Sequence, residues 1–220
     1  MSRQDLAERL ERLLSRPDLD PEVRAALGDA LAEHEAFYAL MRGIPDTVYF
    51  KDAESRFTLI NAAQAAMLGV HRPEDAIGKS DEDYFPQEHA RAARADEQEV
   101  LRTGVPLLDK TELIHGADGR RRWMSATKVP LRDRSGQVVG TVGISRDITQ
   151  REVALRQLAA AEAIAQLGSW SFDLTLGKVT WSDQLYRILG YEPGSFEPAP
   201  GQFLDRLHPE DREKAREAMD

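Results

Sequence analysis

The chain has 220 residues, and its content of 41% hydrophobic and 30% charged residues is ordinary for a globular protein. Its net charge of -9 opposes the binding of nucleic acid phosphates and of anionic membranes. Because the chain has no cysteine, we exclude disulfides, thiolate zinc sites, cysteine nucleophiles and chromophores attached through sulfur.

The N-terminus, MSRQDLAERLERLL, is charged and amphipathic and lacks the apolar core of a signal peptide. No apolar run in the chain reaches the ~18 residues that a membrane helix needs. We therefore expect a cytoplasmic protein with no membrane segment within this chain. The basic run at residues 120–122 lies beside a turn, and a solvated hairpin is a simpler interpretation of it than a nucleic acid contact.

Residues 1–42 are predicted to form two helices, because leucines share one face of the first and an apolar stripe follows the second. Pro17 separates the two helices. Asp20 is placed to cap the second helix, with Pro21 at its first position, where the missing N–H is not needed. Gly43 ends this helix.

From residue 47 the hydrophobic pattern changes its period. The segments TVYFKD (47–52) and RFTLIN (56–61) are rich in aromatic and β-branched residues, which predicts two strands joined by a turn. Two helices follow, separated by a loop-rich segment. The first is the short patch NAAQAAMLG, stopped by Gly69, and the second is a longer helix over 87–103, closed by Gly104.

Three further strands are predicted from LLDKTELIH, RRRWMSATKVPL and QVVGTVGIS, which are separated by the turns GADG and DRSG. Gly140 and Gly143, inside the last of these strands, indicate a close backbone approach or a bulge. The resulting order, β-β-α-α-β-β-β, fits an α+β fold in which a five-stranded antiparallel sheet carries helices on one face.

Residues 147–167 are predicted to form the next helix. Ile148 and Leu155 are seven residues apart, but Glu162 occupies the next equivalent position, so a coiled-coil dimer is only weakly specified. The alternative is a lone amphipathic linker helix.

Beyond residue 168 the strand pattern restarts with SWSFDL and VTWS, followed by the helical segments DQLYRILG and FLDRLHPEDREKAREAMD. This order repeats the first half of residues 47–145, which indicates an internal repeat without its last three strands. Such a half-sheet would expose its apolar side chains, among them Trp170, Phe172, Trp181 and Leu185. We therefore expect residues 169–220 to be loosely packed or docked on another surface.

These segments resemble the PAS domain family. The matching features of the first copy are KDAESRFTLINAAQAAMLG, GKSDEDYFP and DGRRRWMSATKVPLRDRSGQVVGTVGISRDIT, and those of the second copy are LGSWSFDL, VTWSDQLYRILGY and HPEDR. The resemblance divides the chain into an N-terminal helical segment (1–42), a complete PAS domain (43–149), a linker helix (150–168) and an incomplete second PAS domain (169–220).

The resemblance implies a sensory input module of a bacterial cytoplasmic signal-transduction protein, as in two-component systems. Ligand or partner state would pass through the junction Asp147-Ile148-Thr149 to the linker helix, and then to a C-terminal output domain or partner kinase. The implied partners also include a second copy of the chain, bound through the helical segments. The carboxylate of Asp147 can cap the first turn of the linker helix, and it could also pair with Arg146 or Arg151.

Two alternatives stay open. The chain could be the N-terminal fragment of a sensor histidine kinase or of a cyclic-dinucleotide enzyme. It could also be a ligand-free PAS adaptor that dimerises through residues 1–42. The sequence shows no phosphate-binding loop and no nucleophile–base pair, so we expect no catalytic site in it and leave open whether the whole protein is an enzyme.

A cavity inside the PAS domain is the expected ligand site, with an apolar wall and a few placed polar groups. Each candidate also has a simpler explanation as a core or sheet-face residue. The candidate wall residues are Tyr49, Asn61, Met67, Tyr84, Phe85, Trp123, Ser125, Thr127 and Ile144.

The identity of any cofactor is unknown from the sequence. A covalent flavin or another cysteine-linked chromophore is excluded by the missing thiol. The resemblance disfavours haem, because His89 does not match the position of the axial ligand in haem-binding PAS domains. A non-covalent flavin and a small metabolite remain open. The histidines have no metal-site spacing, so no metal site is expected.

Overall fold

The structure is a computed structural model that describes residues 3–199, 202, 204 and 207–217. The chain divides into two compact units, Met1–Thr149 and Gln150–Asp220.

The first unit begins with two helices, α1 (Arg3–Leu14) and α2 (Pro21–Gly43). The predicted cap is confirmed, because Oδ1 of Asp20 accepts hydrogen bonds from the backbone N–H groups of Glu22 (2.8 Å) and Val23 (3.3 Å). Proline occupies the first position of α2, where its missing N–H costs no hydrogen bond.

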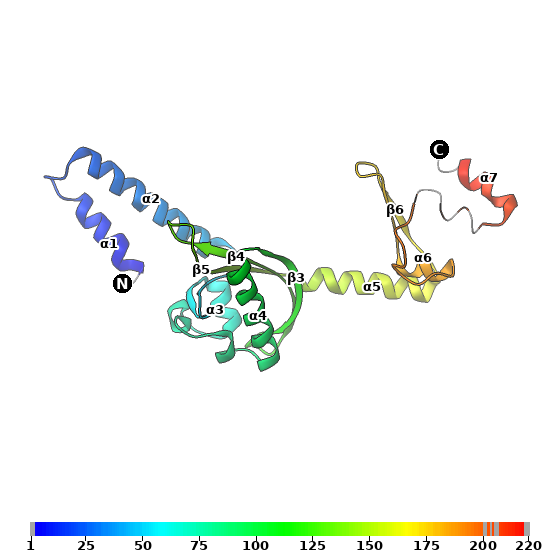
Figure 1. The fold of residues 1–220 in the computed structure, drawn as a ribbon, viewed down its shortest axis with the longest axis horizontal. Coiled ribbons are helices and arrows are strands. Elements are labelled where there is room, and N and C mark those ends of the chain that lie inside the picture. Colours follow the sequence, from blue (N-terminus) through cyan, green and yellow to red (C-terminus); the bar gives the residue numbers. More distant parts are fainter. Residues whose placement is uncertain (1–2, 200–201, 203, 205–206, 218–220) are drawn as a thin grey trace. The chain divides into compact units, whose positions relative to one another are not determined.

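A five-stranded antiparallel sheet forms the centre of this unit (Figure 1). Its strands are β1 (Thr47–Asp52), β2 (Phe57–Ile60), β3 (Leu107–His115), β4 (Arg121–Arg132) and β5 (Val138–Asp147). The spatial order is β2-β1-β5-β4-β3, so the last strand lies between the first strand and β4. Val48 is opposite Ile144 and Tyr49 is opposite Gly143 across the β1–β5 pair. The predicted α+β fold with one shared sheet is confirmed.

The helices between β2 and β3 lie on one face of this sheet (Figure 1). They are α3 (Ala62–Leu68), the short 3-10 helices η1 (Pro73–Ala76) and η2 (Asp81–Asp83), and α4 (Gln87–Thr103). Both α-helices end at the glycines that the sequence indicated, since Gly69 and Gly104 adopt the left-handed conformation.

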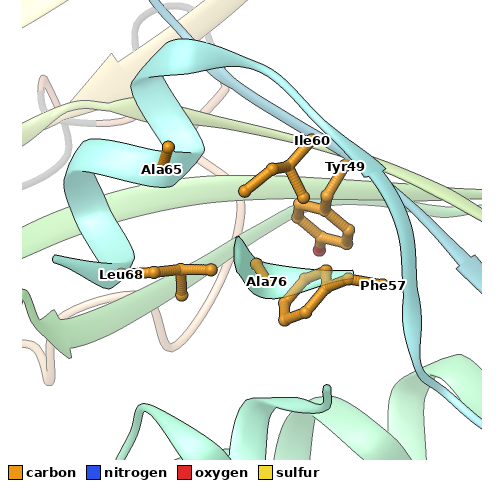
Figure 2. Packing of buried hydrophobic residues seen from close by; sticks show 6 residues of the cluster. All are labelled: Tyr49, Phe57, Ile60, Ala65, Leu68 and Ala76. Carbon is orange, nitrogen blue, oxygen red and sulfur yellow. The ribbon is translucent and has the colours of Figure 1, made fainter. Parts of the chain in front are cut away.

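The main apolar cluster lies between β1, β2 and these helices (Figure 2). It contains Tyr49, Phe57, Ile60, Ala65, Leu68 and Ala76. Gly143 lets Tyr49 pack against the sheet, because a Cβ atom at Gly143 would lie 2.0 Å from the Tyr49 ring. At Gly140 an added Cβ would lie 2.1 Å from the carbonyl oxygen of Lys51. The predicted close backbone approach is therefore present at both glycines.

The second unit contains most of α5 (Thr149–Ala165), then the paired strands β6 (Trp170–Asp173) and β7 (Lys178–Trp181), α6 (Asp183–Ile188) and α7 (Pro209–Glu217). Part of the last predicted helical segment lies outside the described residues. Trp170 and Phe172 are 51% and 43% exposed, as expected for a half-sheet. Trp181 is buried instead, because its ring packs against Tyr186 and Phe196.

None of the helices in the described ranges combines the length and the apolar character that crossing a membrane requires.

Candidate functional site

A small cavity of ≈ 40 Å³ lies between the sheet and the helices of the first unit. Strand alternation explains its wall, because Thr47 and Tyr49 share one face of β1, and Met124 and Lys128 share one face of β4. The wall consists of Thr47, Tyr49, Gln64, Met67, Asp81, Phe85, His89, Ala93, Glu112, Ile114, Met124, Lys128 and Ser145.

Three of the nine predicted wall residues lie in this wall, namely Tyr49, Met67 and Phe85. Asn61 does not line the cavity, because its side chain is hydrogen-bonded to the backbone beside the start of α3. Its Oδ1 accepts from the N–H groups of Val48 (3.0 Å) and Gln64 (2.9 Å), and its Nδ2 donates to the carbonyl of Asp46 (2.8 Å). Binding of a ligand by the three wall residues stays a prediction.

The other five predicted residues also lie outside the wall, which corrects their prediction. Trp123, Ser125 and Thr127 alternate with the buried residues of β4 and therefore belong to the opposite face of the sheet. Ile144 lies on that same outer face and is 42% exposed. Tyr84 packs against the apolar cluster.

A buried ionic network, which no sequence pattern predicted, lies next to the cavity. The side chain of Lys51 is only 1% exposed, and its Nζ pairs with the carboxylates of Asp81 and Glu97, the latter at 2.7 Å. Lys128 Nζ donates to the carbonyl oxygen of Ala93 at 3.0 Å and lies 3.6 Å from Glu97 Oε1. The network therefore connects β1, β4, η2 and α4.

Two further carboxylates extend this network toward β3. Asp96 Oδ2 lies 2.5 Å from Lys110 Nζ and 3.7 Å from Lys128 Nζ. Glu112 Oε2 lies 3.6 Å from Nδ1 of His89. Together with the first contacts, they place ionisable groups from five elements, β1, η2, α4, β3 and β4, around one small volume.

Burial shifts two acid–base groups of the cavity wall. The pKa of His89 is lowered, because desolvation outweighs the opposite effect of Glu112 and Asp81. The pKa of the Tyr49 hydroxyl is raised well above its ordinary value, first by burial and then by the negative charges of Glu97 and Asp81. Both groups therefore favour their neutral forms near neutral pH.

A haem or a flavin does not fit the cavity in this structure. Pockets for drug-sized ligands have volumes of about 300–1,000 Å³, whereas this cavity has ≈ 40 Å³. The space suits a molecule of only a few non-hydrogen atoms.

The junction Asp147-Ile148-Thr149 is held by strand β4. The N–H of Ile148 donates to the carbonyl of Trp123 (2.8 Å), and the N–H of Trp123 donates to Oγ1 of Thr149 (2.9 Å). Oδ1 of Asp147 accepts from the N–H of Thr149 at 2.9 Å, which is the expected capping contact.

Arg122 is the arginine that faces Asp147, at 3.6 Å between Nε and Oδ2. The expected partner Arg146 does not take this role, because its guanidinium pairs with Asp46 at 3.0 Å. The other expected partner, Arg151, makes no ion pair with Asp147 among the described residues. Arg122 also makes two bonds to Asp118, and these lower the pKa of that carboxyl. The basic run at 120–122 therefore includes one residue that ties the β3–β4 turn to the junction.

Comparison with family models gives two matches, both described as "PAS fold". One covers residues 41–153 and the other covers residues 178–220. The first match takes in the sheet, the cavity and the junction.

Two curated relatives illustrate where such segments occur. The chain is 32% identical over 130 residues to the methanogenesis regulatory histidine kinase FilI of Methanothrix harundinacea. The aligned segment covers 59% of this chain and 14% of that protein. It is 31% identical over 124 residues to a diguanylate cyclase of Vibrio cholerae, and the aligned segment covers 54% of this chain and 38% of that protein. The chain thus spans a minor part of the length of these relatives.

Solved structures give the same picture of the fold. The VqmA dimer of Vibrio cholerae, a protein described with the LuxR-type receptors, is 27% identical with a TM-score of 0.50, over 53% of this chain and 52% of that chain. The phage VqmA–DPO complex is 22% identical with a TM-score of 0.50, over 88% and 81% of the two chains. At that lower identity the likeness supports the fold alone.

Proposed function

The chain belongs to the PAS family, and from this premise we propose that residues 43–149 are a sensory input module of a signal-transduction protein. The histidine kinase and the diguanylate cyclase among its relatives support this role. In the whole protein, a linker helix would connect the module to an output domain of one of these classes. A dimer through the helical segments, in the cytoplasm, is part of the same proposal.

The observation that carries the proposal is the short path along β4 from the cavity to the junction. Met124 lines the cavity. The preceding residue, Trp123, makes both backbone bonds to Ile148 and Thr149, and Arg122 faces Asp147. A displacement of β4 at the cavity therefore reaches the start of α5 within two residues.

Such a path transmits a signal only if the junction has two arrangements of similar free energy. A ligand or partner that favours one arrangement shifts the population toward it by its difference in affinity. The hydrogen bonds at Trp123 and Thr149 are contacts that can differ between the two arrangements. The state of the cavity would then set how the first turn of α5 is held.

A cavity-filling substitution tests this coupling without knowledge of the ligand. Ala93 lies in the cavity wall on α4, and Ala95 is exposed on the same helix. We expect Ala93→Val to change the opening free energy of the amides at residues 148–152 by about 1 kcal/mol, measured by hydrogen exchange. Ala95→Val carries the same helix propensity cost and should leave these amides unchanged. Equal exchange in both variants would remove the support for coupling.

The small cavity also favours a second candidate function, a PAS adaptor that binds no ligand. This candidate predicts no saturable binding of a small molecule at the cavity wall. A titration with methylammonium, followed by the methyl resonances of Met67 and Met124, measures that property directly.

A further inference from the structure

The ionic network around the cavity is short of one positive charge. Its carboxylates come from η2, α4 and β3, and its ammonium groups come from β1, β3 and β4. The four carboxylates are those of Asp81, Asp96, Glu97 and Glu112, and the three ammonium groups are those of Lys51, Lys110 and Lys128. An uncompensated charge inside a protein is costly, so this arrangement favours a further cation.

The histidine of the cavity does not supply this charge near neutral pH. Burial lowers the pKa of His89, although Glu112 and Asp81 act in the opposite direction. Acceptor atoms consequently stay available nearby. Glu112, in the cavity wall, has its ion-pair contact with His89 at 3.6 Å. Glu97 is not part of the wall, but its Oε2 is buried without a hydrogen-bond partner among the described residues, which adds to the unbalanced negative charge of the network.

The ammonium group already in the wall, that of Lys128, is bonded to other groups. Lys128 Nζ donates to the carbonyl of Ala93 and faces Glu97 and Asp96. An anionic ligand that approached Lys128 would have to compete with the buried carboxylate of Glu97 and the half-buried carboxylate of Asp96. The wall therefore disfavours small anions.

We propose that the cavity binds a small organic cation, a primary ammonium compound with a few non-hydrogen atoms, held by the carboxylate of Glu112. Thr47 supports this assignment, because its Oγ1 donates to the carbonyl of Ser145 and keeps its lone pairs as acceptors. Apolar wall residues, among them Met67 and Met124, would cover the carbon atoms of the ligand. The assignment rests on the proposed sensory function and names the class of molecule that the module would detect.

The volume of the cavity limits the size of this cation. A cavity needs about 10–15 Å³ of accessible volume to hold one water molecule, and this cavity has ≈ 40 Å³, which suits a molecule of a few non-hydrogen atoms. Methylammonium is therefore a suitable probe. Tetramethylammonium has the same charge, but it is larger and has no N–H donors, so it is the matched control.

Methionine methyl groups give a direct readout in the 220-residue chain. The chain has five methionines, of which Met67 and Met124 line the cavity. Met41 is buried outside it and reports on the fold. With ¹³C-methyl-methionine labelling, methylammonium chloride should shift the Met67 and Met124 resonances in a saturable manner and leave Met41 unchanged. Sodium chloride and sodium acetate at equal ionic strength should not produce this shift.

Variants assign the binding to the named carboxylate. Glu112→Gln should weaken methylammonium binding about tenfold or more, because a charge-assisted hydrogen bond is lost. Glu99→Gln is the control, since Glu99 is exposed on α4 and pairs with Arg102. Ala93→Val should also abolish binding, by filling the cavity without changing its charge. An unchanged Met41 resonance shows that each variant is folded.

Three results would overturn the proposal: no saturable shift, an equal shift with tetramethylammonium or sodium, or unchanged binding in Glu112→Gln. The proposed function fails by a different result. If methylammonium shifts Met67 and Met124 but neither it nor Ala93→Val alters exchange at residues 148–152, the ligand assignment stands and the coupling does not.

Discussion

Asn61 shows how one side chain can fix the start of the sensory domain. It is 3% exposed, and its amide group bonds to four backbone positions, at Ile44 and Asp46 before β1, at Val48 within β1 and at Gln64 in the first turn of α3. The oxygen of the side chain satisfies the N–H of Val48, which is buried. The sequence suggests Asn61 as a ligand contact. Here it stabilises the fold instead, because a buried N–H without a partner is costly.

Replacing this residue should therefore destabilise the domain strongly. We expect Asn61→Ala to lower the free energy of unfolding by about 3 kcal/mol, because both the cap and the partner of the Val48 N–H are lost. Asn61→Ser keeps an oxygen that can accept from the N–H of Gln64 and loses the donations to Asp46 and Ile44, so its cost should be smaller. Urea unfolding monitored by circular dichroism measures both. Equal costs in the two variants would show that the accepting oxygen is not the important group.

The inward lysines illustrate what residue patterns can and cannot predict. Lys51 has the same strand parity as Tyr49, and Lys128 has the same parity as Met124, so alternation alone could have placed both in the interior. Their partners could not be found in this way, since Glu97 is 46 residues from Lys51 in the chain. The sequence also left open which face of β4 lies toward the helices, because Trp123 makes the face opposite to Met124 and Lys128 the more apolar one. Three of the six predicted wall residues that lie elsewhere, Trp123, Ser125 and Thr127, were misplaced for this reason.

At the scale of elements, α4 is the helix that the ionic network attaches to the sheet. Its buried positions include two small residues, Ala90 and Ala93, which allow close packing, and Glu97, which is 1% exposed. Glu97 accepts from Lys51 on β1 and faces Lys128 on β4. The position of α4 over the sheet thus depends on charge pairs as well as on apolar contacts.

Two lysines that both pair with α4 allow a matched test of this dependence. Lys51→Met should lower the free energy of unfolding by about 3–5 kcal/mol, since it leaves buried carboxylates without their partner. Lys110 pairs with Asp96 but is 35% exposed, and Lys110→Met should cost about 1 kcal/mol or less. Adding Glu97→Gln to Lys51→Met should restore part of the loss. Thermal or urea unfolding measures the series, and a similar cost for the two single variants would contradict the role of burial.

The elements themselves were largely predictable, because their ends carry local signals. Asp20 caps α2, Gly69 and Gly104 end α3 and α4, and Gly119 and Gly136 adopt positive φ in the two hairpin turns. The pairing of β1 with β5 has no such local signal, since about ninety residues separate them. The predicted element order gave one five-stranded sheet but did not specify that pairing.

For the whole molecule, the repeat of the PAS pattern joins a complete sheet to a second sheet of two described strands. The second family match covers residues 178–220, and the sheet that the structure describes there consists of β6 and β7, with four residues each. Its apolar cluster is small, with Val179, Trp181 and Tyr186 buried. A two-stranded sheet is at best marginally stable in water, whereas five strands covered by helices bury a larger core.

This difference predicts unequal protection of the two sheets in the 220-residue chain. We expect the opening free energy of the amides at 178–181 to be about 3 kcal/mol below that of the amides at 47–52. Hydrogen exchange with mass spectrometry measures both segments in one sample, so solvent conditions and protein concentration are matched. Dilution should leave the difference unchanged in a monomer. Equal protection of the two segments in monomeric protein would mean that residues 169–220 form a stable unit without the strands that complete the first copy.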